Sequence, residues 1–295
     1  MRFFILLVAA CLHLVASDLY IMSIDNSDNK IDAKVIENAL IDNGFEISAN
    51  TEMNDPFIKQ FGESGFTHFN LLTAYHKVHT INLLKSEPDS GIFAPMGFGV
   101  YQAKGDSVLR VSILTAEAME KIVGVKSPEF KKLEGSAIEA IKKALPSIKI
   151  VKSDKSLEAQ GELFSKFIKS DSDASDKDDV EMMIEEGLKP MGFVMSNFSD
   201  FNFVLGDESP FDFYDTYSIC KLKVIYNVAK TRPEAAAFAP CSLMVYKKKD
   251  SDEIVLGFPS VYNWMSSALV VDSEGKEELL IAQRDFQEIL ESAIE

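Results

Sequence analysis

The stretch AYHKVHTINLLKSEPDSGIFAPMGFGVYQAK, residues 74–104, aligns without gaps with ICKLKVIYNVAKTRPEAAAFAPCSLMVYKKK, residues 219–249. The two stretches lie 145 positions apart (219 − 74 = 145) and share the residues of a proline-flanked segment. The shared pairs are Asn82/Asn227, Lys85/Lys230, Pro88/Pro233, Phe93/Phe238, Ala94/Ala239, Pro95/Pro240, Val100/Val245 and Tyr101/Tyr246. Self-similarity at a fixed offset is typical of duplicated architecture, so we interpret the chain as two tandem copies of one unit.

Strands and helices are expected in the same order in both copies. Gly44-Phe45 corresponds to Gly192-Phe193 at an offset of 148, so the second copy has lost three residues farther along. Apolar residues alternating along the chain predict strands, and apolar stripes at helical spacing predict helices. The predicted elements of the first copy are strands over 18–25, 45–53, 66–75, 92–102 and 107–113 and helices over 31–43, 55–60, 76–86, 115–123 and 128–144.

The sequence therefore predicts an α+β fold made of two tandem copies of a small sheet-plus-helices domain, packed as an intrachain pseudo-dimer. Between the copies we expect a helix over 157–168 and then a solvated stretch, SDSDASDKDD, over 170–179. The expected division is a signal peptide over 1–17, a first repeat domain over 18–148, a helix and acidic linker over 149–179, and a second repeat domain over 180–295.

The first residues, MRFFILLVAACLHLVAS, combine a basic start, a short apolar run and small residues at its end. This pattern predicts a secretory signal peptide cleaved near Ser17, and therefore a periplasmic or secreted protein. The triplet before Cys11 offers an alternative, a lipoprotein anchored through Cys11, but it leaves a very short apolar stretch before that cysteine. No later segment is apolar enough to predict a transmembrane helix.

Charge and composition exclude one class of partner. The chain carries 46 acidic and 30 basic residues, a net charge of −16, and 46% of its residues are hydrophobic. Nucleic-acid binding requires clustered Lys and Arg, so we expect no nucleic-acid partner. The hydrophobic content is that of a globular protein, and the acidity favours solubility.

The pattern of the second copy resembles the Domain of Unknown Function 302 family. The residues that carry the resemblance are Gly192-Phe193, Cys220, Pro233, Pro240-Cys241 and Val245-Tyr246. In the first copy they are Gly44-Phe45, Pro88, Pro95 and Val100-Tyr101, with Tyr75 and Met96 where the cysteines would stand. The resemblance covers about residues 30–125 and 178–265. It implies a small α+β domain that dimerises, which a tandem copy would satisfy within one chain, and it implies no established activity.

Cys220 and Cys241 are the first candidate site, with three readings left open. They are the only cysteines after Cys11, and in an oxidising compartment they could form a disulfide worth roughly 3 kcal/mol. A thiolate near a helix start could instead bind a soft metal or perform redox chemistry. The third reading is two small buried hydrophobic residues. Two cysteines alone do not complete a metal site.

Two further sets of residues are weaker candidates. His76 and His79 are expected on one helix face and would suit a metal ion, with His68 on the preceding strand as a third ligand only if its side chain points the same way. Lys221 and Val224 occupy the equivalent positions of the second copy, which favours surface histidines. Asn82 and Asn227 are shared polar residues that could contact a ligand or the local backbone.

No nucleophile–base pair, phosphate loop or dinucleotide fingerprint is present in the sequence. We therefore expect a non-enzymatic binding or accessory protein, with a small-ligand pocket near Cys220 and Cys241 or at the pseudo-dimer interface. The alternative is a thiol-dependent redox or metal-handling protein that uses these two cysteines. The sequence does not identify a cofactor. The expected partners are a small molecule or a metal ion, and further oligomerisation stays open.

Overall fold

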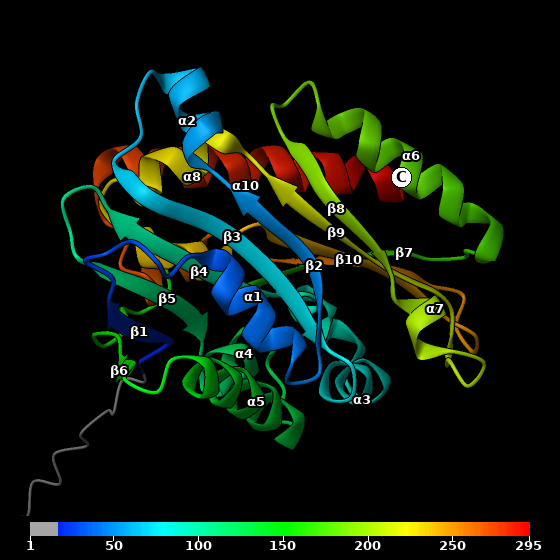
Figure 1. Ribbon diagram of the computed structural model, residues 1–295. Helices are drawn as coiled ribbons and strands as arrows, with labels where there is room; N and C mark the ends of the chain where they lie inside the picture. Colours follow the sequence, from blue (N-terminus) through cyan, green and yellow to red (C-terminus); the bar gives the residue numbers. More distant parts are fainter. Residues whose placement is uncertain (1–16) are drawn as a thin grey trace, which may run out of the picture.

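The computed structural model describes residues 17–295, so the expected signal segment and Cys11 lie outside the described residues. It contains two antiparallel sheets with helices packed around them (Figure 1). The prediction of an α+β fold is therefore confirmed. Within residues 17–295, none of the helices combines the length and the apolar character needed to cross a bilayer.

The first half of the chain forms a six-stranded sheet in the order β2-β3-β4-β5-β1-β6. Its elements are β1 (Leu19–Asp25), α1 (Ala33–Ile41), β2 (Phe45–Glu52), α2 (Asn54–Phe61), β3 (Phe66–His76), α3 (His79–Ser86), the 3₁₀ helix η1 (Pro88–Phe93), β4 (Met96–Ala103), β5 (Val108–Leu114), α4 (Ala116–Val123), α5 (Pro128–Ala144) and β6 (Lys149–Lys152).

The second half forms a five-stranded sheet in the order β7-β11-β10-β9-β8. Its elements are β7 (Phe164–Lys169), the 3₁₀ helix η2 (Ala174–Asp176), α6 (Lys177–Leu188), β8 (Val194–Asp200), α7 (Phe201–Leu205), β9 (Phe211–Cys220), α8 (Leu222–Ala229), the 3₁₀ helix η3 (Pro233–Phe238), β10 (Cys241–Lys248), β11 (Ile254–Pro259), α9 (Tyr262–Ser267) and α10 (Ser273–Ile294).

The two sheets share their strand pairing down to single residues. Leu19 pairs with Leu114 in the first half, and Phe164 pairs with Pro259 in the second, each partner displaced by 145 positions (19 + 145 = 164, 114 + 145 = 259). The edge strands share a bulge at one serine, Ser48 in β2 and Ser196 in β8, displaced by 148 positions. Because register decides which face each side chain occupies, the two halves present equivalent positions to equivalent surroundings.

Local sequence explains where the longest helices begin. Helix α5 starts at Pro128 behind Ser127, whose side chain accepts a hydrogen bond from the Glu129 backbone N–H. Helix α10 starts behind Asp272, which accepts from the Gly275 N–H. Proline at the first helical position and a capping side chain before it are favourable because the first N–H groups of a helix have no partner in the helix itself. Both helices then bury an apolar stripe.

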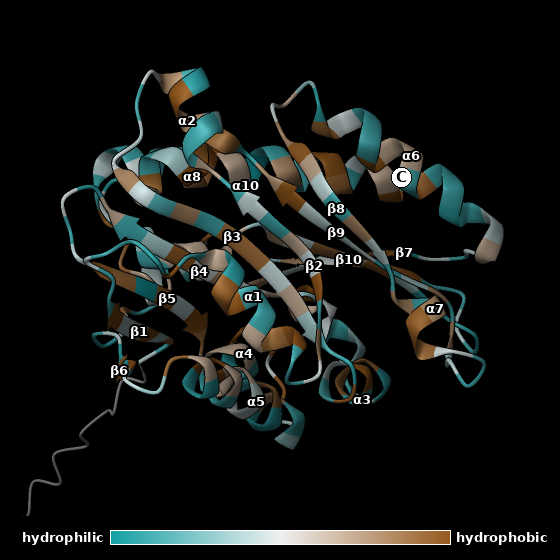
Figure 2. Cartoon of the chain, in the orientation of Figure 1, coloured by the Kyte–Doolittle hydropathy of each residue, from teal (hydrophilic) through white to brown (hydrophobic). Residues whose placement is uncertain are grey.

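The helices cover the outer faces of the two sheets. In the first half α1 packs against α5, and in the second half α6 packs against α10. Figure 2 shows hydrophobic and hydrophilic residues banded along the strands, as expected for sheets whose faces differ in burial. The inner faces meet each other through η1 and η3, so these two proline-initiated segments lie between the sheets.

The expected helix over 157–168 is wrong. Residues 164–169 form the strand β7, which pairs along its whole length with β11. Leu163, Phe164, Phe167 and Ile168 have helical spacing, but β7 takes the sheet position that β1 holds in the first half. Pairing with β11 therefore overrides the local pattern. The stretch over 170–179 also contains η2 and the first turn of α6.

Candidate functional site

The second half contacts the first through η3, which we call the second arm. It lies on β4 and β5, where glycines allow its backbone to approach. A Cβ atom added to Gly97 would lie 2.6 Å from the Ala237 carbonyl oxygen, and one added to Gly99 would lie 2.6 Å from the Ala236 Cβ. The second arm can therefore approach β4 this closely only because Gly97 and Gly99 carry no side chains.

The first arm, η1, makes the reciprocal contact with β10 and β11, and the Tyr214 side chain reaches it from β9. The Tyr214 hydroxyl donates to the Pro88 carbonyl oxygen and occupies the space where a Gly91 side chain would lie. Asp89 accepts a hydrogen bond from the Tyr246 hydroxyl at 2.9 Å and pairs with Lys166 Nζ at 2.8 Å. Burial and the Asp89 carboxylate raise the pKa of Tyr246, so its phenol stays protonated.

A cavity of about 220 Å³ lies between the halves, at the edge where β2 faces β8. Each half contributes five of its lining residues, and no lining side chain is charged. The lining residues are Ala49, Thr51, Met53, Pro56 and Leu71 from the first half and Val194, Ser196, Cys220, Leu222 and Pro240 from the second. We call this space the inter-half cavity.

The equivalent position on the other side of the interface is filled. Tyr75 stands where the second half has Cys220, and Phe201 stands where the first half has Met53 (75 + 145 = 220, 53 + 148 = 201). The Tyr75 and Phe201 rings meet edge to face with their centroids 5.0 Å apart. Burial and the nearby Glu46 carboxylate raise the pKa of Tyr75 to about 12. Two aromatic rings thus close one position, while smaller side chains leave the other open.

Cys220 and Cys241 are free thiols in the structure. Cys241 pairs with Ile219 across β9 and β10, so the two cysteines are offset by one residue. Directly opposite residues share a face of a regular sheet, so a disulfide would require Cys220, the last residue of β9, to depart from the strand geometry. Cys220 lines both the inter-half cavity and a second cavity of about 30 Å³ in the core beneath α8 and α10, where Cys241 also lies.

The environment of the two cysteines disfavours thiolate chemistry. Burial raises the pKa of Cys220 to about 12, and the nearby Cys241 adds to this shift. Burial alone raises the pKa of Cys241 to about 12. Since the thiolate is the nucleophile and the metal ligand, these raised pKa values favour the neutral thiol near neutral pH.

The histidines do not share a helix face as expected. His76 ends β3 and His79 begins α3, with their rings stacked at 4.3 Å. His76 Nδ1 accepts from the backbone N–H groups of Val78 and His79, and burial, aided by His79, lowers its pKa. His79 Nδ1 lies 3.1 Å from the Glu129 carboxylate. These contacts hold the turn from β3 into α3 in place.

His68 lies far along β3 from His76, so it is not a third ligand as suggested. Among residues 17–295 no group of three or more His, Cys, Asp or Glu side chains is arranged to hold a metal ion.

The two shared asparagines have different surroundings. Asn82 is exposed on α3, whereas Asn227 is buried on α8 and accepts a hydrogen bond from Lys230 Nζ at 3.2 Å. Neither residue lines the inter-half cavity. Asn227 therefore contributes to the local structure of α8.

A buried carboxylate distinguishes the second sheet from the first. Asp215 on β9 is fully buried and pairs with Lys177 Nζ at 2.6 Å. Burial raises the pKa of Asp215 to about 7, against the lowering effect of Lys177. The equivalent position in the first half is Asn70, which donates to Asn50 at 2.9 Å (70 + 145 = 215).

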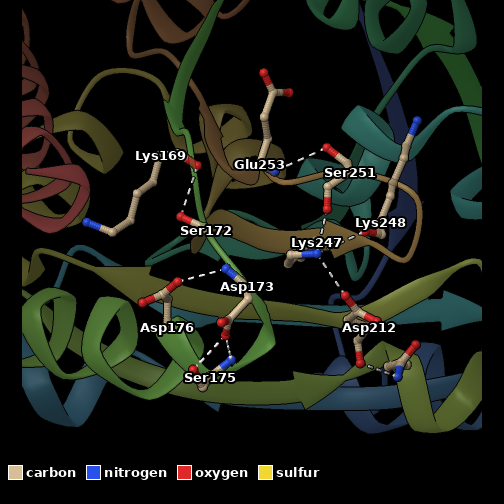
Figure 3. Close-up of polar contacts among 11 residues, drawn as sticks. Lys169, Ser172, Asp173, Ser175, Asp176, Asp212, Lys247, Lys248, Ser251 and Glu253 are labelled. Carbon is tan, nitrogen blue, oxygen red and sulfur yellow. Dashed lines mark hydrogen bonds and ion pairs between the residues drawn. The ribbon is translucent and has the colours of Figure 1, made fainter.

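Lys247 is a buried cation with a structural role (Figure 3). Its Nζ atom donates to the Asp212 carboxylate at 2.9 Å and to the Ser251 carbonyl oxygen at 2.5 Å. The equivalent Gln102 donates to the equivalent carbonyl oxygen, that of Asp106, at 2.7 Å. Both side chains thus hold the hairpin turn between two paired strands, and Lys247 is not available as a catalytic amine.

Sequence reasoning missed most of the cavity lining. Met53 and Leu71 come from one half and Val194 and Leu222 from the other, and none of them belongs to a recognisable motif. The available signal was the difference between aligned residues. At the offset of 148 positions, Ala49 aligns with Asn197 and Met53 aligns with Phe201. Smaller residues in one copy than in the other indicate where space can remain.

No protein-family model matches the chain, and no curated protein is similar to it. The chain is similar to a crystal structure of an uncharacterized conserved protein, DUF302, from Bacillus stearothermophilus, with 16% sequence identity and a TM-score of 0.37. The match covers 45% of this chain and 99% of that one. This likeness concerns the fold alone.

Proposed function

We propose that this protein is a non-enzymatic binding protein that holds a small, neutral, largely apolar molecule in the inter-half cavity. The observation that carries the proposal is the open position at Cys220, set against the closed position at Tyr75. An unfilled cavity loses the packing contacts that the Tyr75 and Phe201 rings make at the other position, and a bound molecule would restore such contacts.

The size and lining of the cavity define the ligand class. An apolar cavity of roughly 150 Å³ can bind benzene, so about 220 Å³ suits a molecule somewhat larger, such as a bicyclic aromatic compound or a branched terpene-like alcohol. The lining has no charged side chain to neutralise an ionised ligand, and burying an unpaired charge is costly. Val194, which is 60% exposed, stands at the solvent side of the cavity.

The test is a calorimetric titration of the protein with each of three probes, indole, naphthalene and geraniol. Cys220→Tyr installs the first-half residue and fills the cavity, so we expect at least a tenfold loss of affinity for whichever probe binds. Cys220→Ser keeps the volume and removes the thiol, so binding should change by less than about threefold. A thermal unfolding profile on each variant checks that it is folded.

The same variants separate the proposal from its alternative. If Cys220→Ser abolishes binding as completely as Cys220→Tyr, the thiol itself is required and the redox or metal-handling function is favoured. If none of the probes binds, and the protein purified from its own compartment carries no small molecule by native mass spectrometry, the binding proposal fails.

Export is part of the same proposal and rests on the N-terminal sequence. We propose that the signal peptide is removed and that the protein works in a periplasmic or extracellular space. Amino-terminal sequencing of the protein from its source should give Asp18 as the first residue. A mature chain that begins at a lipidated Cys11 would replace this proposal with a membrane-anchored form.

A further inference from the structure

A second, polar space lies between the halves, away from the inter-half cavity. It has a volume of about 360 Å³ and is bounded by β1, β5 and β6 of the first half and by the start of the second arm. Arg110 from β5 and Arg232 from the residue before η3 both line it. We call it the arginine cavity.

The presence of two arginines in one cavity is unusual for this chain. The sequence contains 30 basic residues, of which only Arg2, Arg110, Arg232 and Arg284 are arginines. Arg284 lies on α10 with 70% of its side chain exposed. The net charge is −16, so the surface as a whole repels anions. Lys152 also lines the arginine cavity, as do the carboxylates of Asp154 and Glu234. An anion there would therefore lie among three cationic and two acidic side chains.

Both guanidinium groups keep donors available. Within residues 17–295, the hydrogen bonds of the Arg110 side chain use Nη1 alone, to Asp106 and to the Val108 carbonyl oxygen. Its Nε and Nη2 groups have no partner there. Arg232 makes no side-chain hydrogen bond in the same range, and its Nη1 lies 3.6 Å from Glu234 Oε1. Arginine presents its N–H groups as a planar fork that matches carboxylates and phosphates.

The equivalent place on the first arm is closed by the protein itself. There the carboxylate of Asp89 is held by Lys166 and by the Tyr246 hydroxyl. The equivalent of Asp89 is Glu234 (89 + 145 = 234), and the equivalent of Lys166 is Ile21, which cannot donate. The second arm therefore lacks the partner that closes the first, and a cavity with unused arginine donors takes its place.

We propose that the arginine cavity binds a small oxyanion, a carboxylate or a phosphate, between Arg110 of the first half and Arg232 of the second. The anion accepts hydrogen bonds from the guanidinium N–H groups of Arg110 and Arg232 that have no partner within residues 17–295. It would link the two halves at the second arm as Asp89 links them at the first. This site is independent of the inter-half cavity and of the ligand proposed for it.

The experiment measures binding of inorganic phosphate and of succinate by calorimetry at low ionic strength. We expect saturable binding of at least one anion, weakened about tenfold or more by Arg110→Gln and by Arg232→Gln, since each removes charge-assisted hydrogen bonds. Glu234→Gln removes a competing negative charge and should strengthen binding severalfold. Comparison of the two anions distinguishes a phosphate ligand from a carboxylate ligand.

Controls keep the outcome clear. Arg284→Gln changes the net charge equally but lies elsewhere, so it should leave binding unchanged. Absence of saturable binding for both anions overturns the proposal, as does an equal loss in Arg284→Gln. If an arginine variant fails to fold, the gain expected from Glu234→Gln still tests the site in an otherwise intact protein. Cys220→Tyr should not alter anion binding, so failure here is distinct from failure of the apolar site.

Discussion

The two halves share the order and register of five strands, with β6 added only to the first sheet, but they differ at the positions where they meet. In the first half the Tyr75 ring packs against Phe201 and fills that position. The Asp89 carboxylate is bound by Lys166 and by the Tyr246 hydroxyl. In the second half Cys220 borders a cavity, and Arg232 keeps free donors. The shared positions maintain the fold, and both proposed binding sites lie at positions where the halves differ.

The largest effect is expected when the closed position is opened. Tyr75→Cys installs the second-half residue and removes a buried ring that packs on Phe201, so the free energy of unfolding should fall by about 3 kcal/mol. Urea unfolding measures this cost. Cys220→Tyr is the matched reverse change and enters an existing cavity, so it should cost less than about 1 kcal/mol. Equal costs would contradict the asymmetry between the two positions.

The next effect concerns the contact of the second arm with β4. Gly97→Ala places a methyl group against the Ala237 carbonyl oxygen, and the free energy of unfolding should fall by roughly 2 kcal/mol. Gly135 lies in α5 with nothing within 4 Å of an added Cβ, so Gly135→Ala should raise stability by up to about 1 kcal/mol. If both substitutions stabilise, the close approach of the arm is not as described.

A smaller, pH-dependent effect is expected at Asp215. Its pKa is raised from 3.8 to about 7, so between these values the folded protein binds a proton that the unfolded chain has lost. Stability from this group is present below pH 4 and is lost as pH rises through 7. Asp215→Asn, which installs the equivalent of Asn70, should raise stability at pH 8 relative to pH 5 by on the order of 1–2 kcal/mol, measured by urea unfolding at both pH values. An unchanged pH dependence would place the ionised carboxylate in the folded state.

The sequence was sufficient for the order of most elements but not for their contacts. Its repeat predicted the strands and helices around Pro88 and Pro233, because proline and glycine punctuate the chain locally. It missed β7 because Phe164 and Phe167 fit a helix as well as a strand, and only pairing with β11 decides. Met53 of the first half and Cys220 of the second both line the inter-half cavity. Their proximity depends on how the two halves pack, which the sequence does not specify. The difference between Tyr75 and Cys220 was visible beforehand and marks one wall of that cavity.

The smallest expected effect on the free energy of unfolding comes from removing one tyrosine hydroxyl at each arm, that of Tyr246 or that of Tyr101. Tyr246→Phe removes the hydrogen bond to Asp89 and leaves that carboxylate with Lys166 alone, so the free energy of unfolding should fall by about 1 kcal/mol. Tyr101 is the equivalent residue, and within the described part of the chain its hydroxyl makes no hydrogen bond, so Tyr101→Phe should change stability by less than about 0.5 kcal/mol.

Denaturant unfolding of the two tyrosine variants side by side measures the difference between the arms. If phosphate or succinate occupies the arginine cavity, adding it should stabilise the wild type and Tyr246→Phe equally, because the anion acts at the other arm. A stabilisation that disappears in Tyr246→Phe would mean that the anion binds at Asp89 and Lys166 instead. Because the two arms have the same fold, the response of each variant to the anion identifies the arm at which the anion binds.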